Sequence, residues 1–340
     1  MQGNAPLNEF DLIARLQQRF SDDLPASVQL GIGDDAALVQ PHLGEHLVVT
    51  MDTLHGGVHF PHETRASDLA WKALAVNLSD LAAMGAEPRW CTLSLALERL
   101  DVDWLESFIE GFQALARIYP IALIGGDTTS GPLSISLTAI GGIPTGRAMR
   151  RDGAKVGDDI WLTGCTGNAS AALWLWQQGR LDLQARSTDV IHEQLRQSLL
   201  RPMPRIREGI AVRSLATAAI DLSDGLVADL GHICRCSQLG AEIDLALLPA
   251  CQAGALDVSR QQLAVWQLSG GDDYELCFTA SPSYRQAIHQ AFVQSTAGAT
   301  RIGRVVAEKG VRVRTSVGTI LPLARTGYQH FSPDAEQDAL

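Results

Sequence analysis

The stretch LAWKALAVNLSDLAAM, residues 69–84, is apolar on nearly every side of the helix that it predicts. We expect this helix to begin near Ser67, to end at Gly85 and to be buried on most sides. Asn77 and Asp80 lie three residues apart and therefore share one face. A buried carboxylate is costly unless it is paired or bound to a metal. Asp80 is therefore expected to bind either a partner arginine or a cation.

Elements of both kinds surround this helix along the chain. Helices are expected over residues 7–20 and 103–119, and strands over residues 47–51, 121–124 and 133–140, the first of these strands being buried. Downstream, another strand leads into residues 221–225, and a helix follows to about Cys236. The alternation predicts a protein of mixed helices and strands.

The length and a change of composition predict two domains. A chain of 340 residues exceeds one comfortable core, and glycine, proline and arginine gather between residues 141 and 159. We therefore expect domains over residues 1–145 and 146–340, with a frayed tail at 333–340. No internal repeat is evident.

The composition is that of a folded protein without a membrane span. Apolar residues make up 46% and charged residues 19%, and no run of about 18 uncharged apolar residues occurs. No basic stretch followed by an apolar core opens the sequence, so no secretory signal is expected and the predicted location is cytoplasmic. The net charge of −11 argues against nucleic acid and membrane surfaces as partners. It reflects either solubility alone or carboxylates clustered to hold cations.

The six cysteines are scattered, mostly in apolar surroundings, which predicts reduced and buried thiols. Only Cys234 and Cys236 lie close together in sequence, and no second pair exists to complete a zinc site.

Six short segments place aspartates beside glycine or hydroxyl residues, at the ends of expected strands or on a helix. They are GIGDDA at residues 31–36, TMDT at 50–53, NLSD at 77–80, GGDTT at 125–129, DLSDG at 221–225 and SGGDDYE at 269–275. One such turn is ordinary turn chemistry, but six of them predict hard oxygen ligands for Mg²⁺. The first resembles a dinucleotide fingerprint, but its two carboxylates would repel a pyrophosphate.

Other phosphate-binding motifs are missing from the sequence. No lysine follows a glycine, as a P-loop requires, and no His-Arg-Asp loop of protein kinases occurs. Basic residues instead gather near the expected domain boundary: Arg147, Arg150, Arg151 and Lys155. They either neutralise phosphate oxygens or form a solvated basic turn.

Together the acidic segments resemble the thiamine-monophosphate kinase family, within the superfamily of aminoimidazole ribonucleotide synthetase. Five blocks occur in the family's order between about Phe10 and Phe331: GIGDDA, KALAVNLSDLAAMGA, LIGGDTT, IDLSDGL and SGGDDYEL. The resemblance implies a mixed α/β and α+β architecture of two domains. The N-terminal α/β domain would bind ATP and Mg²⁺ and pair with its twin into a homodimer, and the C-terminal α+β domain would close the site. The implied activity is ATP-dependent phosphorylation of thiamine monophosphate to thiamine diphosphate, the last step in making that coenzyme.

Position by position, the resemblance implies three sets of contacts. The implied ligands of several Mg²⁺ ions are Asp35, Thr50, Met51, Asp52, Asp80, Asp127, Asp221 and Asp224. The implied ATP contacts are Gly126, Asp127, Arg151 and Ser223, and the implied substrate contacts are His59, Asp272 and Tyr328. Two positions depart from the family. Met51 replaces a threonine, so it could bind a metal only through its backbone carbonyl, and Asp272 replaces a glutamate and is shorter by one methylene.

The implied reaction requires no catalytic side chain in the usual sense. The acceptor is a phosphate monoester, largely dianionic near neutrality because its second pKa is about 6. Direct in-line transfer therefore needs neither a general base nor a covalent nucleophile, and positioning and charge neutralisation dominate.

Four alternatives remain to be weighed against a kinase, and two of them make demands on the sequence. A selenophosphate synthetase should carry a reactive cysteine in its N-terminal segment, but no cysteine precedes Cys91. A hydrogenase-maturation relative should end in a cysteine-bearing tail, whereas the given sequence ends in Ala339-Leu340. Aminoimidazole ribonucleotide synthetase itself, and a non-catalytic sensor of cations or nucleotides, are separated from a kinase by assay.

Overall fold

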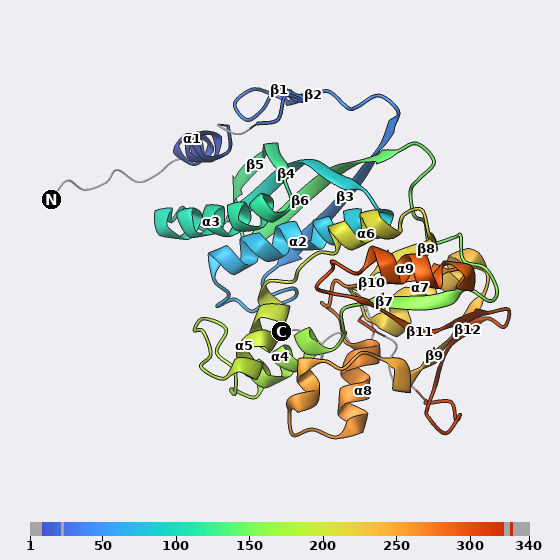
Figure 1. Ribbon diagram of the computed structural model, residues 1–340. Helices are drawn as coiled ribbons and strands as arrows, with labels where there is room; N and C mark the ends of the chain where they lie inside the picture. The colour runs from blue at the N-terminus through green and yellow to red at the C-terminus, as the bar shows by residue number, and fades with distance from the viewer. Residues whose placement is uncertain (1–8, 22–23, 323–326, 329–340) are drawn as a thin grey trace. The chain divides into compact units, whose positions relative to one another are not determined.

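The computed structural model describes residues 9–21, 24–322 and 327–328 (Figure 1). The predicted tail at 333–340 lies outside these residues. The described chain forms two compact units. One comprises the chain up to residue 81 together with residues 87–145, and the other comprises residues 82–86 together with the chain from residue 146. No helix in the described ranges is long and apolar enough to cross a membrane.

The first unit is built on a four-stranded sheet in the order β3-β6-β4-β5. These strands are β3 (Glu45–His55), β6 (Ser134–Pro144), β4 (Glu87–Leu97) and β5 (Ala122–Ser130), and only the β4-β5 pair is parallel. Helices α2 (Ala66–Met84) and α3 (Val102–Ile118) cover one face of the sheet (Figure 1). The remaining elements are α1 (Glu9–Phe20) and a short pair of strands, β1 (Val28–Leu30) and β2 (Leu38–Val39).

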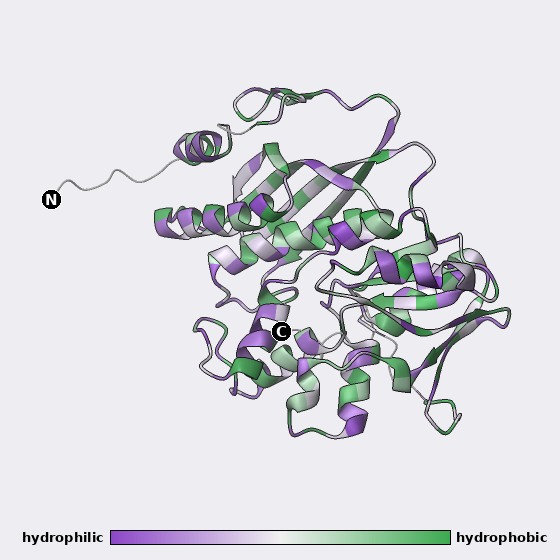
Figure 2. Cartoon of the chain, in the orientation of Figure 1, coloured by the Kyte–Doolittle hydropathy of each residue, from purple (hydrophilic) through white to green (hydrophobic). Residues whose placement is uncertain are grey.

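The two helices differ in how they are buried. Almost all of α2 is inaccessible to solvent, as its sequence predicts, and it begins at Ala66, one residue earlier than expected. Gly85 follows its last residue with φ +72°, the left-handed conformation that commonly ends a helix. Helix α3 is amphipathic. It buries one stripe that includes Phe108 and Phe112, and Figure 2 shows hydrophilic and hydrophobic residues alternating along it.

Two predictions about strands are wrong. The strand at 47–51 is part of β3, which is an edge strand, and the side chains of Leu47, Val49 and Met51 are 44%, 62% and 60% exposed. Its apolar run therefore lies on the face of the sheet opposite α2, which we call the second face. Strand β5 does not end at its glycines but continues to Ser130. A Cβ at Gly126 would lie 1.8 Å from the carbonyl oxygen of Leu93, so glycine permits this close approach of the two strands.

The second unit is built on a six-stranded sheet in the order β12-β9-β11-β7-β10-β8. The strands are β7 (Asp159–Thr163), β8 (Ala216–Asp221), β9 (Gly240–Asp244), β10 (Leu276–Ala280), β11 (Ala299–Val306) and β12 (Gly310–Arg314). The helices are α4 (Asn168–Gln177), α5 (Val190–Leu200), α6 (Ile206–Val212), α7 (Leu226–Ser237), α8 (Arg260–Ser269) and α9 (Arg285–Ala291). Three short turns of 3₁₀ helix are η1 (Leu245–Leu247), η2 (Gln252–Ala255) and η3 (Pro282–Tyr284).

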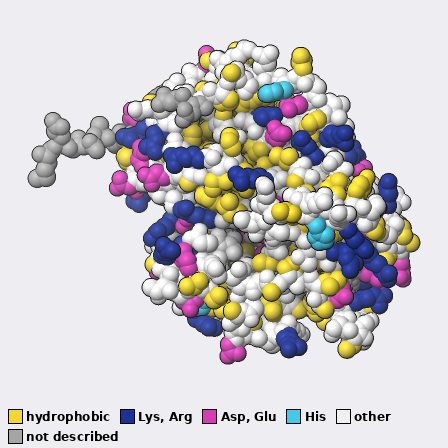
Figure 3. All heavy atoms as spheres, viewed as in Figure 1, with side chains coloured by type: hydrophobic (Ala, Val, Ile, Leu, Met, Phe, Trp, Pro, Cys, Tyr) yellow, Lys and Arg dark blue, Asp and Glu magenta, His cyan; other side chains and the backbone are white. Residues whose placement is uncertain are grey.

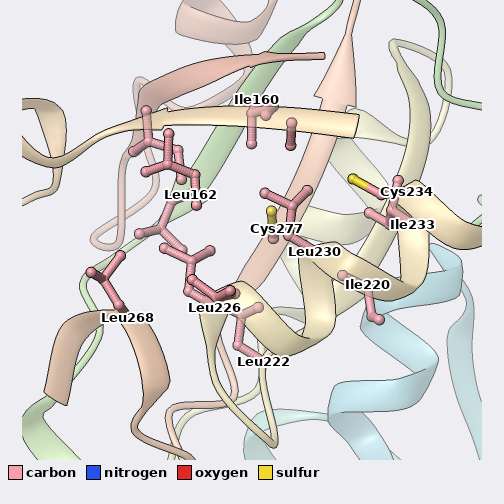
Figure 4. Packing of buried hydrophobic residues seen from close by; sticks show 14 of the residues in the cluster. Ile160, Leu162, Ile220, Leu222, Leu226, Leu230, Ile233, Cys234, Leu268 and Cys277 are labelled. Carbon is pink, nitrogen blue, oxygen red and sulfur yellow. The ribbon is translucent and has the colours of Figure 1, made fainter. Parts of the chain in front are cut away.

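Helix α7 packs on one face of this sheet. Its residues Leu226, Leu230 and Ile233 recur at helical spacing and meet Ile160 and Cys277 from the strands (Figure 4). Because α7 follows directly from the 221–225 turn, this packing fixes where the turn lies. All six cysteines lie in the described part of the chain and none forms a disulfide.

Acidic and basic side chains are both exposed on the face that Figure 3 shows. In the view of Figure 3, acidic side chains lie among basic ones. Glu242 illustrates this, because it accepts hydrogen bonds from both Arg304 and Arg314.

Candidate functional site

Two segments of the first unit bring predicted metal ligands together. Thr50 and Asp52 lie two apart on β3 and therefore point to the same face of the sheet, towards α2. The hydroxyl of Thr50 donates a hydrogen bond to the carboxylate of Asp80 in the middle of α2. Burial and the negative charge of Asp80 raise the pKa of Asp52 to about 6. The three oxygen-bearing side chains thus form one half-buried acidic cluster.

The neighbouring residues of the strand point the other way. Met51 is exposed on the second face, so its side chain is directed away from Asp52. Thr53 shares that face, and its hydroxyl lies 2.8 Å from the hydroxyl of Ser136 on β6.

Asp127 also lies on the second face. The strand register aligns Thr53 with Ser136, Ser136 with Ser94, and Ser94 with Asp127, in one row across the sheet. Residues paired in this way point to the same side of a sheet. Asp127 is exposed at the far end of the row, three strand spacings or about 14 Å from β3. One copy of the unit therefore keeps Asp127 apart from Asp52 and Asp80.

The two remaining predicted residues of this unit lie in loops. Asp35 is exposed in a turn where its own N–H donates to the carboxylate of Asp34 at 2.8 Å. His59 follows β3 and is held at two atoms. Its Nδ1 accepts the N–H of His55 at 3.0 Å, and its carbonyl accepts from Nζ of the buried Lys72 at 3.1 Å.

In the second unit, the predicted ligand Asp221 is the last residue of β8. The predicted ligand Asp224 and the predicted nucleotide contact Ser223 follow in the tight turn that leads to α7. The side chain of Asp229, in the first turn of α7, accepts the N–H groups of Asp224 and Gly225, both at 3.1 Å. Burial and the charge of Asp224 raise the pKa of Asp229 to about 7.

The predicted substrate contacts are bonded to this same turn through the backbone. The N–H of Asp272 donates to the carbonyl of Ser223 at 2.9 Å, and the N–H of Tyr328 donates to the carbonyl of Asp224 at 3.0 Å. The loop that carries Asp272 is strained, because Asp272 and Tyr274 adopt φ values of +67° and +51°. The Tyr274 hydroxyl donates to the Asp272 carboxylate at 2.9 Å, which fixes its direction.

Of the basic residues near the boundary, two differ in their surroundings. Arg150 is exposed and binds Asp152 through two hydrogen bonds of 2.9 and 2.6 Å, as expected of a solvated basic turn. Arg151 is exposed beside α7, where its charge acts on Asp229. Burial, Arg235 and, least of the three, Arg151 lower the pKa of His232.

Two acids of the 269–275 segment have structural roles. Asp273 accepts the N–H of Gly167 at 2.9 Å, and its burial raises the pKa of its carboxyl group. Glu275 is 5% exposed and accepts hydrogen bonds from Thr163 and from Arg205. The sequence pattern marks the whole segment as acidic and does not separate these two residues from Asp272.

The sequence pattern does not single out Asp229. It stands four residues after Gly225 at a helix start, and this position, where a side chain can bind free N–H groups, could have indicated it.

Carboxylate and hydroxyl oxygens are the donors that Mg²⁺ prefers, so the donor set fits the predicted metal. The close approach of Asp52 and Asp80 supports this fit, because a cation would offset their repulsion. Within the described residues, however, no three His, Cys, Asp or Glu side chains gather into a metal cluster. The predicted ligands instead lie in separate small groups.

Comparisons with known proteins identify the family of this chain. Residues 33–143 match the family of AIR synthase related proteins, N-terminal domain, and residues 155–316 match the corresponding C-terminal domain. The chain is 46% identical to the thiamine-monophosphate kinase of Escherichia coli K12, over 95% of this chain and 98% of that protein.

Solved structures give the same result. The thiamine-monophosphate kinase of Stenotrophomonas maltophilia K279a is 52% identical with a TM-score of 0.85, over 91% of this chain and 97% of that one. A complex of AaThiL with AMPPCP and TMP is 29% identical with a TM-score of 0.73, over 97% and 100% of the two chains. The expected two-domain, aminoimidazole ribonucleotide synthetase-like architecture is thereby confirmed. By its sequence and its fold, the chain belongs to the thiamine-monophosphate kinase family.

Proposed function

We propose that this chain transfers the γ-phosphoryl group of ATP to thiamine monophosphate, giving ADP and thiamine diphosphate. One observation carries the proposal beyond family membership. The turn that bears Ser223 and Asp224 is hydrogen-bonded through its backbone to Asp272 and Tyr328. One predicted ATP contact, Ser223, and two predicted contacts of thiamine monophosphate, Asp272 and Tyr328, are therefore joined by backbone hydrogen bonds in the second unit.

Magnesium would be held by the eight oxygen-donating positions implied by the family. These are Asp35, Thr50, Asp52, Asp80, Asp127, Asp221 and Asp224 through their side chains, and Met51 through its carbonyl. When bound, Mg²⁺ neutralises phosphate oxygens and reduces the repulsion between two polyanions.

The chain's own residues orient the reactants. Arg151 would contact the nucleotide phosphates from the side of α7, and Gly126 would allow the nucleotide to approach the backbone of β5. Tyr328 would stack on a ring of the thiamine, and His59, whose Nδ1 is occupied, would offer Nε2–H to the substrate phosphate.

Transfer would be direct, because a dianionic acceptor needs no activated protein nucleophile. The test is incubation with ATP labelled at the γ-phosphate in the absence of acceptor, followed by denaturation. We expect no label on the protein, and stoichiometric label would refute the single-step reaction.

We further propose that the active form is a homodimer whose subunits share the site. Asp127 and Asp52 point to opposite faces of one sheet, and they could serve one site only if Asp127 came from a second copy. The exposed apolar side chains of Leu47, Val49 and Met51 on the second face are suited to such a contact.

Mixing two inactive variants tests the shared site. In a heterodimer of Asp52→Asn and Asp127→Asn, a shared arrangement leaves one site with both aspartates intact and places both substitutions in the other. Statistical mixing should then restore about one quarter of the wild-type activity. If both aspartates came from the same subunit, every site would carry one substitution and the mixture would stay inactive.

The substrate is tested by incubating the chain with MgATP and a panel of phosphorylated metabolites, thiamine monophosphate among them. Thiamine diphosphate formed only from thiamine monophosphate supports the proposal. Turnover of another acceptor would favour a different synthetase of the superfamily, and nucleotide binding without ADP release would favour a sensor. We also propose a cytoplasmic location and no nucleic-acid or membrane partner.

A further inference from the structure

The 221–225 turn carries more than its own side chains. Its carbonyl groups at Leu222, Ser223 and Asp224 accept the N–H groups of Tyr274, Asp272 and Tyr328, at distances of 2.8, 2.9 and 3.0 Å. Any shift of the turn would therefore move the two residues predicted to contact thiamine monophosphate.

The N–H groups of Asp224 and Gly225 share one side-chain acceptor, whereas the N–H of Leu222 donates to the carbonyl of Glu275 at 2.9 Å. One carboxylate oxygen of Asp229, a residue only 3% exposed, accepts from both Asp224 and Gly225. The backbone N–H of Asp229 in turn donates to the carbonyl of Gly225 at 3.0 Å. Asp229 thus binds N–H groups of the turn, whereas the carbonyl groups of the turn bind residues 272, 274 and 328.

The position of Asp229 is itself fixed by packing. It lies between Leu226 and Leu230 of α7, both fully buried in the core of the second unit. Because α7 is held by the core and the Asp229 side chain is short, the position of its carboxylate is well defined.

We propose that Asp229 is a positioning residue that sets the geometry of the nucleotide contact and of the thiamine monophosphate contacts together. The inference rests on the proposed function but names a residue and a coupling that the function does not require. It predicts that losing the hydrogen bonds to Asp229 weakens the binding of both substrates, although Asp229 itself would contact neither of them.

The test compares Asp229→Ala with Asp229→Asn. The alanine variant should raise KM for ATP and for thiamine monophosphate together, by about 10–100-fold, the usual effect of losing an outer partner of a metal site. The asparagine variant should stay within about threefold of wild type, because a single amide oxygen can accept both hydrogen bonds.

Asp244→Ala is the matched control. Asp244 also accepts a backbone N–H in the second unit, from Ala246 at 3.0 Å, but it does so at η1. This variant should leave both KM values unchanged. Amide hydrogen exchange adds a readout independent of activity: the N–H groups of Asp224 and Gly225 should lose protection in Asp229→Ala and keep it in Asp229→Asn.

Two results would overturn the inference. In one, Asp229→Ala melts at a lower temperature while both KM values stay at wild type, which is the behaviour of a purely structural cap. In the other, Asp229→Asn is as impaired as Asp229→Ala, which would assign the effect to charge instead of hydrogen bonding. If the alanine variant does not fold, Asp229→Glu takes its place: it keeps the carboxylate but displaces it by one methylene, so both KM values should rise together, and wild-type KM values would overturn the inference. A wild-type chain that fails to make thiamine diphosphate would defeat the proposed function, whereas nucleotide-analogue binding by the variants would still test the anchor.

Discussion

Asp52 on β3 and Glu242 on β9 are both half-buried carboxylates on strands, yet their surroundings shift their pKa values in opposite directions. Burial and the neighbouring Asp80 raise the pKa of Asp52 to about 6. Hydrogen bonds from Arg314 and Arg304 lower the pKa of Glu242 to about 2. The first carboxylate has a like charge beside it, and the second has two guanidinium groups.

We interpret this difference as one between carboxylates that arginines of the chain neutralise and carboxylates that are suited to a bound cation. Glu242 and Glu275 are satisfied by arginines of the chain itself, so they contribute to the second unit without any cofactor. Asp52 and Asp80 carry a cost that a bound cation would offset.

The largest expected effect concerns a structural acid. Arg205→Ala leaves the buried Glu275 without its guanidinium and should lower the free energy of unfolding by about 3–5 kcal/mol. Arg304→Ala removes a partner that is 65% exposed from Glu242 and should cost less than about 1 kcal/mol. Chemical denaturation of both variants checks this. Equal losses would show that burial does not distinguish the two pairs.

The second effect concerns two of the aspartates proposed to bind Mg²⁺. Asp80→Asn and Asp127→Asn should each lower kcat/KM at least about 10–100-fold at limiting Mg²⁺. Glu242→Gln serves as the matched control and should leave kcat/KM unchanged, since its carboxylate binds only the chain's own arginines. Near-normal rates for both aspartate variants would remove the distinction between the two groups of acids.

The next prediction concerns Tyr328, a predicted contact of thiamine monophosphate in the second unit. Tyr328→Ala should raise KM for thiamine monophosphate about tenfold, the loss expected for one aromatic contact, while KM for ATP and kcat change little. Steady-state kinetics with each substrate varied in turn measures this. Equal losses for both substrates with a lowered melting temperature would instead make Tyr328 an anchor of the C-terminal segment.

The smallest expected effect is a pH dependence of stability. Because the pKa of Glu242 is about 2 in the folded chain and 4.5 as its ordinary value, its ionised form stabilises the fold above about pH 4.5. That contribution, about 1 kcal/mol after solvent screening, should be lost as the pH falls from 4.5 towards 2. Glu242→Gln should flatten this part of the unfolding profile. An unchanged profile would mean that the two arginines do not hold the carboxylate in solution.

Several helices and strands could be predicted from the sequence because hydrophobic patterning is a local property of the chain. The uniformly apolar run at 69–84 has one physical solution, a buried helix, and α2 is that helix. The run at 47–51 has two, since an apolar strand can lie in a sheet interior or at an exposed face, and burial was predicted wrongly there. The difference depends on which strand lies at the edge, which local pattern does not record.

The candidate site divides in the same way. Aspartates beside glycines mark the segments, but whether an acid meets an arginine or another acid depends on contacts between distant residues. Glu275 and Arg205 are 70 positions apart, and Thr50 and Asp80 are 30 apart. The opposite orientations of Asp52 and Asp127 follow only from the strand register.

The central claim is that Asp52 of β3 and Asp80 of α2 bind cations used in phosphoryl transfer. The Mg²⁺ dependence of thiamine diphosphate formation tests this claim most directly. At fixed ATP and thiamine monophosphate, we predict no product without a divalent cation. We also predict a rate that keeps rising after all ATP is bound to magnesium, with this second rise shifted to higher Mg²⁺ in Asp52→Asn. A rate that saturates as soon as MgATP has formed, identically in wild type and in Asp52→Asn, would contradict the account.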